Sequence, residues 1–174
     1  YVIDINRDTQ LQDSYAGTPH TLVVGIARTG GTEYRFKLFG HDGQAYRPIG
    51  IKEVETLRPV LFKPMGTPQP DPYYIASDAD YVDYITELMG GFAVPPFVKE
   101  RRLGKRYLFL GLRLNRDTER MVMTDLIYAH AQPAGWALIA DPTEKERRFC
   151  ERVGIRIVEA DFHELIGGEA LAAA

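Results

Sequence analysis

Short apolar runs alternate with longer mixed segments in the second half of the chain. Residues 107–110, 136–140 and 155–158 are apolar runs of strand length, and the segments between them predict two helices. Because strands separated by helices of this length pair in parallel, the pattern predicts a doubly wound sheet. We expect the first of these strands to be buried on both faces, since its apolar run is uninterrupted.

Capping and turn residues mark where these helices begin. Asn115 and Asp117 are expected to cap the first helix. Asp141, followed by Pro142 and Glu144, is expected to cap the second. Doubly wound sheets bind ligands beyond the carboxyl ends of their strands. The sequence therefore predicts a ligand-binding edge formed by residues 111–115, 141–143 and 159–162.

The first half of the chain predicts further strands and one hairpin. The strands are expected at residues 1–5, 21–27, 33–39 and 59–63. A glycine-containing turn at residues 40–43 leads back toward Tyr46, which indicates a β-hairpin, and His41 is expected to be solvated at its tip. The predicted fold class is therefore α/β, with a Rossmann-like, doubly wound, mainly parallel sheet and an inserted β-hairpin.

Length and charge limit the classes of partner. The chain has 174 residues, 45% of them hydrophobic, which predicts a single domain over residues 1–174. Its formal charge of −3 provides no field that attracts nucleic acid, so no nucleic-acid partner is expected. A basic cluster at residues 99–106 is interpreted as a solvated helix end. No apolar run reaches the roughly 20 residues that span a bilayer, and no membrane association is expected.

The number of cysteines limits the covalent and metal sites that the chain can form. Cys150 is the only cysteine, which excludes an internal disulfide and any multi-cysteine zinc site, and no metal is expected. Its position next to Phe149 predicts a small buried side chain. A reducing, cytoplasmic location fits this usage.

Five short motifs follow one another along nearly the whole chain. They are Asp-Ile-Asn-Arg-Asp at 4–8, Lys-Pro-Met-Gly at 63–66, Ser-Asp-Ala-Asp-Tyr at 77–81, Leu-Phe-Leu-Gly-Leu-Arg at 108–113 with Asp117 nearby, and the closing segment 145–161. Their order and spacing resemble the sirtuin-like NAD-binding family, in particular its divergent bacterial branch. The resemblance implies a Rossmann-type domain that binds NAD or ADP-ribose.

The resemblance also implies roles for particular residues near the nicotinamide ribose. Asn6 and Asp8 match the asparagine and aspartate that follow an early strand in the family, and they are the candidate catalytic residues. An asparagine can orient ribose hydroxyls or a water molecule, and a carboxylate can steady the carboxamide or a developing positive charge.

The phosphate and adenosine side of the ligand is implied to lie on the later turns. Gly111, Leu112 and Arg113 match the turn that contacts the phosphates and the adenosine ribose, and Arg113 could bind a phosphate. Asp141 and Asp161 lie on the loops implied to flank the adenine.

Three departures from the family pattern bear on catalysis. Met65 occupies the position of the family's catalytic histidine, and methionine cannot accept a proton. No glycine-rich phosphate loop precedes Asn6, so we expect either a fragment that lacks its N-terminal strand and phosphate loop or a protein without that loop. The four-cysteine zinc module of the deacetylase branch is missing, which argues against a protein deacylase.

Three functions remain open at the level of the sequence. The first is a degenerate sirtuin-like domain that binds NAD or ADP-ribose as a non-catalytic sensor or structural module, together with an additional domain or protein partner. The second is an active NAD glycohydrolase of the bacterial defence type. The third is an unrelated α/β interaction domain.

Overall fold

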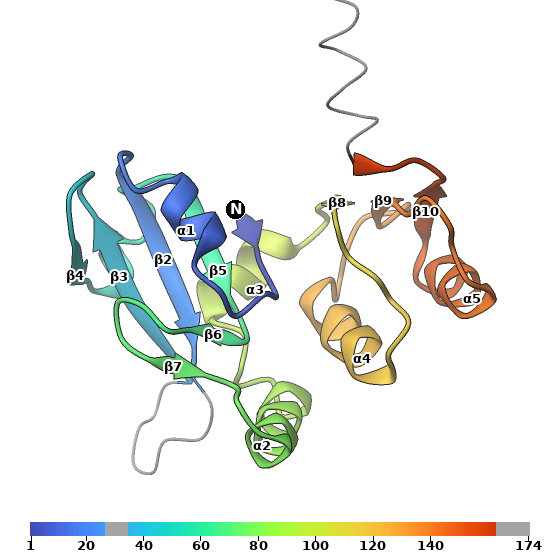
Figure 1. Cartoon of the computed structure of the whole chain (residues 1–174), viewed down its shortest axis with the longest axis horizontal. Helices are drawn as coiled ribbons and strands as arrows, with labels where there is room; N and C mark the ends of the chain where they lie inside the picture. Colours follow the sequence, from blue (N-terminus) through green and yellow to red (C-terminus); the bar gives the residue numbers. More distant parts are fainter. Residues whose placement is uncertain (27–34, 163–174) are drawn as a thin grey trace, which may run out of the picture. The chain divides into compact units, whose positions relative to one another are not determined.

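The chain folds into two compact units, Tyr1–Pro95 and Pro96–Ala174, called here the N-terminal and the C-terminal unit. The computed structural model (Figure 1) describes residues 1–26 and 35–162. Its strands pair mainly in parallel and are joined to antiparallel hairpins, so the predicted α/β fold class is confirmed. That residues 1–174 form a single domain stays a prediction. Within the described residues, no helix is long and apolar enough to cross a membrane.

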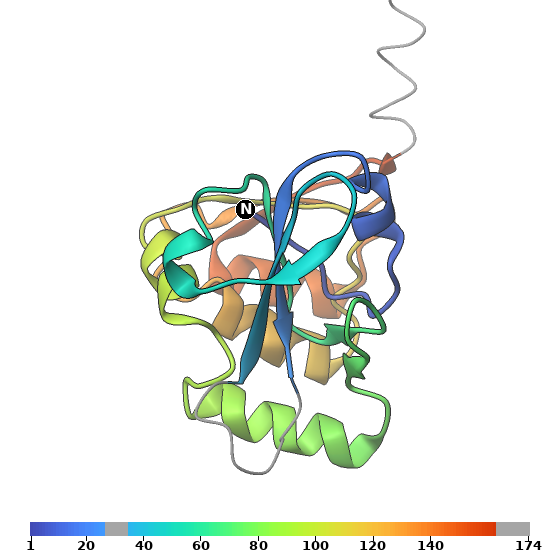
Figure 2. The same cartoon turned by 90° about the vertical axis from the view of Figure 1, so that its left-hand side faces the viewer.

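The N-terminal unit is built on a five-stranded sheet in the order β1-β5-β2-β3-β4. Strands β1, β5 and β2 are parallel, whereas β3 and β4 continue the sheet in antiparallel fashion (Figure 2). A second, two-stranded sheet pairs β6 with β7. The elements are β1 (Val2–Ile3), α1 (Gln10–Ser14), β2 (His20–Gly25), β3 (Phe36–His41), β4 (Tyr46–Pro48), η1 (Ile51–Glu53), β5 (Val60–Lys63), β6 (Gly66–Thr67), β7 (Tyr73–Tyr74) and α2 (Asp78–Met89).

The core of the N-terminal unit lies around β2, in which every residue is buried. Leu22 and Leu61 are fully inaccessible to solvent and sit at the same level of the β2/β5 ladder. Leu11 of α1 packs against their cluster, which fixes this short helix on one face of the sheet. The four strands predicted in this half have counterparts in β1, β2, β3 and β5, although β1 is shorter than expected and β3 continues to His41. Residues 27, 33 and 34 of the predicted strands lie outside the described residues.

The C-terminal unit is a three-stranded parallel sheet in the order β10-β9-β8. Helices α4 and α5 connect its neighbouring strands, and their side chains Met123 and Phe149 pack against Phe109 and Ala137 in one cluster. Both helices therefore cover the same face of the sheet (Figure 1). The elements are α3 (Pro96–Arg102), β8 (Tyr107–Phe109), α4 (Asp117–Leu126), β9 (Gly135–Leu138), α5 (Glu144–Val153) and β10 (Ile155–Val158).

The expectation that the strand at 107–110 is buried on both faces was wrong. Leu108 is 60% exposed and its register partner Trp136 is 36% exposed, because α4 and α5 lie on the opposite face of the unit. Cys150, by contrast, is buried as predicted, and burial raises the pKa of its thiol to about 11.

Two predicted helix caps were also wrong. Helix α4 has Arg116 at its N-cap, and the Asn115 side chain instead accepts a hydrogen bond from the Thr143 hydroxyl at 2.8 Å. Helix α5 begins two residues later than expected, with Thr143 as the N-cap and Glu146 completing a capping box. The side chains of Asn115, Thr143 and Glu146 all take part in the contacts of the candidate region described below.

His41 is not solvated, contrary to expectation. It is 5% exposed and stacks on His20, with the ring centroids 4.7 Å apart. The predicted hairpin itself is present, since His41 pairs with Tyr46 across β3 and β4. The antiparallel pairing of β2 with β3 brings His20 opposite His41, which buries both rings.

Candidate functional site

One candidate region lies in the N-terminal unit, where β1 and β5 end. These strands are parallel neighbours, with Ile3 opposite Phe62, and the Asp4 N–H donates to the Phe62 carbonyl at 2.9 Å. The segments that leave them, residues 6–8 and residues 64–66, therefore start from the same edge of the sheet. We call these two segments the N-terminal turns.

Asn6 and Asp8 are both exposed on the first of these turns. The Asn6 N–H donates to the Asp4 carboxylate at 2.9 Å, which leaves the Asn6 amide side chain at the surface. The Asp8 carboxylate accepts the N–H of Gln10 at 3.1 Å, at the start of α1. Asp8 therefore makes the local capping contact that its position favours, and the catalytic roles of Asn6 and Asp8 stay predictions.

Arg7 stabilises the same turn from the other side. Its guanidinium donates to the carbonyl of Ile75, and the Ile75 N–H donates to the carbonyl of Met65 at 3.1 Å. Arg7 and Met65 are thus linked through one residue that follows β7. The second N-terminal turn is in this way joined to the first by hydrogen bonds.

Met65 is partly buried in the second turn, which is tightly packed around it. Gly66 has a φ of 83°, and a Cβ there would lie 2.1 Å from the Tyr73 carbonyl oxygen. A Cβ on Gly25, at the end of β2, would lie 2.1 Å from the Pro64 carbonyl oxygen. Close backbone packing therefore sets where Met65 stands.

A buried ion pair stands at the base of both N-terminal turns and was missed by the sequence reasoning. Lys63 is the last residue of β5 and is completely inaccessible, and its Nζ donates to Asp4 Oδ2 at 2.6 Å. The signal that could have found it is the presence of opposite charges at the ends of two predicted apolar strands.

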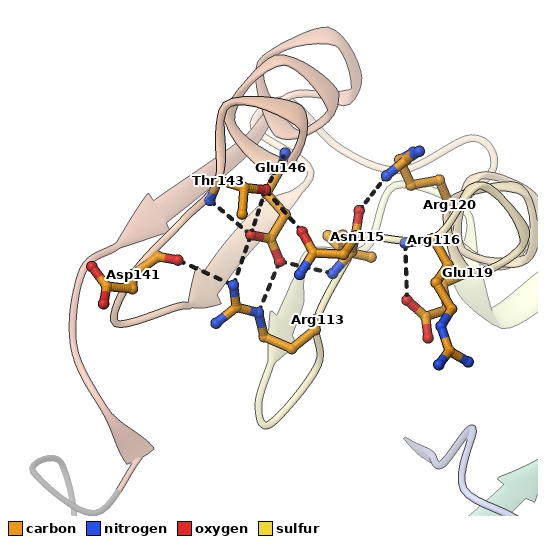
Figure 3. Close-up of polar contacts among 9 residues, drawn as sticks. Arg113, Asn115, Arg116, Glu119, Arg120, Asp141, Thr143 and Glu146 are labelled. Atoms are coloured by element: carbon orange, nitrogen blue, oxygen red, sulfur yellow. Dashed lines mark hydrogen bonds and ion pairs between the residues drawn. The ribbon is translucent and has the colours of Figure 1, made fainter.

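A separate candidate region lies in the C-terminal unit, between the end of β8 and the start of α5 (Figure 3). Arg113 makes a two-pronged contact with Glu146, with Nε to Oε1 at 3.0 Å and Nη2 to Oε2 at 3.1 Å. Its Nη2 also donates to the Asp141 carbonyl at 3.1 Å. The guanidinium therefore ties together residues 111–116 and residues 141–143, which we call the C-terminal turns.

Glu146 is the centre of this network and was also missed. Its side chain is completely inaccessible. Besides Arg113, it accepts the Leu114 N–H at 3.0 Å, the Thr143 N–H at 2.8 Å and the Thr143 hydroxyl at 2.9 Å. Burial opposes ionisation, but these donors outweigh it and hold the pKa of Glu146 below its usual value. Its spacing of three residues from Thr143 is the capping-box signal that could have found it.

The remaining predicted cofactor-binding residues differ in their surroundings. Gly111 has a φ of 62°, and a Cβ there would have no atom within 4 Å, so its left-handed turn faces open space. Leu112 packs against the apolar cluster under the sheet. Asp141 and Asp161 are exposed. Arg113 is half-exposed, and its Nη1 points away from Glu146 (Figure 3).

The structure thus brings the predicted residues together in two sets. Asn6, Asp8 and Met65 lie on the N-terminal turns, and Arg113 and Asp141 are in contact on the C-terminal turns. Each set belongs to its own unit. Among residues 1–26 and 35–162, no three histidine, cysteine, aspartate or glutamate side chains form a group that could hold a metal ion.

A model of the SIR2-like domain matches residues 2–158 of the chain. No curated protein and no solved structure matches it.

Proposed function

Because this chain belongs to the SIR2-like domain family, we propose that it binds NAD or ADP-ribose as a non-catalytic sensor or structural module. The family itself implies a sirtuin-like, NAD-related function. The family match covers the first four motifs and residues 145–158 of the fifth, so the chain is not unrelated to the family, as the third hypothesis from the sequence had it. The additional domain or partner through which such a module would act remains part of the proposal.

The observation that carries this proposal is the position of Met65. Its turn and the Asn6 turn leave the carboxyl ends of two adjacent parallel strands, where nucleotides bind in doubly wound sheets. An amide such as that of Asn6 can orient a ribose hydroxyl, but hydrolysis of the bond to nicotinamide also releases a proton from the attacking water, and a general base accepts that proton. The thioether of Met65 cannot do this, so binding without turnover is the expected outcome.

The C-terminal turns support a role on the phosphate side. Arg113 is held by a buried carboxylate, so its guanidinium is pre-oriented, and Nη1 remains directed outward. The open left-handed turn at Gly111 lets another group approach the backbone closely. These two features suit a phosphate oxygen better than an apolar group.

The proposal is tested first by binding. Thermal unfolding and titration calorimetry of the chain, with millimolar NAD and separately with ADP-ribose, should show saturable binding and a raised melting temperature. A ligand at a hundred times its Kd adds about 2.7 kcal/mol to the free energy of unfolding. If neither ligand binds, the proposed function is wrong.

Turnover is tested by restoring a base. Met65→His should release nicotinamide from NAD, whereas the parent chain should not. Met89→His is the matched control, because Met89 is 76% exposed on α2 and the same substitution there should leave the chain inactive. Nicotinamide is measured by chromatography under identical conditions for all three proteins.

The active NAD glycohydrolase is the second candidate, favoured by the exposed Asn6 and Asp8 side chains on one turn. If it is correct, the parent chain releases nicotinamide, and Asn6→Ala abolishes the release. This result would replace the non-catalytic proposal.

A further inference from the structure

The buried ion pair between Lys63 and Asp4 has an unusual position. Lys63 is wholly inaccessible and the Asp4 side chain is 12% exposed. Asp4 lies two residues before Asn6, and Lys63 lies two residues before Met65. The pair therefore joins the residue that follows β1 to the last residue of β5, immediately before both N-terminal turns.

Each oxygen of the Asp4 carboxylate has a separate partner. Oδ2 accepts from the Lys63 ammonium at 2.6 Å, and Oδ1 accepts the Asn6 N–H at 2.9 Å. Among the residues that the structure describes, Asp4 is the one hydrogen-bond acceptor found on Lys63 Nζ. The ammonium thus fixes the carboxylate, and the carboxylate fixes the backbone at Asn6.

Stability alone does not explain an ion pair in this place. The free energy needed to take two charges out of water offsets much of the attraction between them. Proteins with an apolar pair of similar volume in place of a buried ion pair are often as stable or more stable. An apolar pair could fill the same space between β1 and β5. It could not accept the Asn6 N–H.

We propose that Lys63 and Asp4 form a positioning pair that sets the Asn6 turn beside the Met65 turn for a dinucleotide. The proposal rests on the proposed function for its ligand, although its structural part does not. A charge-assisted hydrogen bond is short and directional, so it orients the Asp4 carboxylate. The Asn6 turn then leaves β1 in one conformation, with its amide ready for the ligand.

The test replaces the pair by apolar residues of similar size. The variant Asp4→Leu with Lys63→Met removes both charges and the acceptor for Asn6. The control variant Lys37→Met with Asp71→Leu removes another lysine–aspartate pair of the same unit, which is more exposed and joined at 2.7 Å. Amide hydrogen exchange of Asn6 by NMR, melting temperature and ADP-ribose affinity are measured for both and for the parent.

If the pair positions the Asn6 turn, its removal should loosen that turn while leaving the melting temperature of the chain nearly unchanged. The Asp4→Leu, Lys63→Met variant should melt close to the parent, while exchange at the Asn6 amide accelerates about ten-fold because its acceptor is lost. Its affinity for ADP-ribose should fall by a similar factor. The control should change neither quantity. Unchanged exchange at Asn6 would overturn the proposal.

The design keeps the two proposals apart. If the parent binds neither NAD nor ADP-ribose, the proposed function fails, and the exchange rate of Asn6 still decides whether the pair positions the turn. If the Asp4→Leu, Lys63→Met variant does not fold, Asp4→Asn with Lys63→Met is measured instead. That variant keeps the shape and removes both charges, so faster exchange at Asn6 is expected, and a parental rate would again contradict the proposal.

Discussion

The two candidate regions, one in each unit, use their ion pairs in opposite ways. In the N-terminal unit the cation, Lys63, is fully buried and has one acceptor, Asp4, among the described residues. In the C-terminal unit the anion, Glu146, is fully buried and is surrounded by donors, whereas its partner Arg113 is 49% exposed. Both pairs lie beyond the carboxyl ends of parallel strands. They differ in the backbone groups that each carboxylate binds.

This difference indicates that the two ion pairs have different structural roles. Glu146 accepts two backbone N–H groups, one of them at the N-cap of α5, and also pairs with an arginine. The fold of the C-terminal turns therefore depends on it. The Lys63 and Asp4 pair satisfies one backbone N–H of an exposed turn. We therefore expect the loss of Glu146 to lower the free energy of unfolding. We expect the loss of the Lys63 and Asp4 pair to make the backbone at Asn6 more mobile.

The largest expected effect is that of Glu146→Ala. It removes the acceptor of the buried Leu114 N–H and leaves Arg113 without its partner, so the free energy of unfolding should fall by about 3 kcal/mol. The chain has one tryptophan, Trp136 in β9, so its fluorescence during urea unfolding reports on the C-terminal unit.

The control for this prediction is Glu144→Ala on the same helix. Glu144 is an exposed carboxylate paired with Arg148 at 3.5 Å, and its loss should change stability by less than about 0.5 kcal/mol. Equal effects of the two substitutions would mean that the network around Glu146 is not what stabilises these turns.

A second prediction concerns the close packing of the N-terminal turns. Gly25→Ala places a Cβ against the Pro64 carbonyl, so the Met65 turn must shift, at a cost of about 1–3 kcal/mol. ADP-ribose affinity should fall with it, as measured by calorimetry. Gly17→Ala is the matched control, because no atom lies within 4 Å of its Cβ, and it should leave both quantities unchanged. Parental affinity in Gly25→Ala would show that binding does not depend on this turn.

Features that depend on neighbouring residues were the ones the sequence predicted well. The strand Ile155–Val158 was correct, because it follows from a local run of apolar residues. The cap of α5 was displaced by two residues, since Thr143 and Glu146 serve a network that reaches Arg113, 33 positions from Glu146.

Contacts between distant residues could not be predicted in the same way. Asp4 and Lys63 are 59 positions apart, and their contact depends on the pairing of β1 with β5. The burial of His41 likewise depends on the register of β2 against β3. Sequence reasoning located the turns at the strand ends, but the groups that hold those turns became visible only from the register of the strands.

The smallest expected effect concerns acid and the histidine pair of the N-terminal unit. His20 is satisfied as a neutral ring, since Nδ1 contacts the Thr18 carbonyl at 2.8 Å and Nε2 contacts the Tyr46 hydroxyl at 2.7 Å. Burial lowers the pKa of His20, the Thr18 carbonyl opposes this, and charge on His41 adds to the lowering. In the described part of the C-terminal unit the one histidine is His130, which is only partly buried.

The sign of the pH dependence follows from the lowered pKa. As the pH falls below about 6.5, the unfolded chain takes up a proton at His20 that the folded chain does not, so stability falls. One proton limits the slope to about 1.4 kcal/mol per pH unit. Urea unfolding followed by circular dichroism at pH 7.5, 6.5 and 5.5 stays, by design, above the acid range in which Glu146 titrates. His20→Gln should flatten this slope, whereas His130→Gln in the C-terminal unit should not. The parental slope in His20→Gln would place the acid sensitivity elsewhere and remove this contrast between the two units.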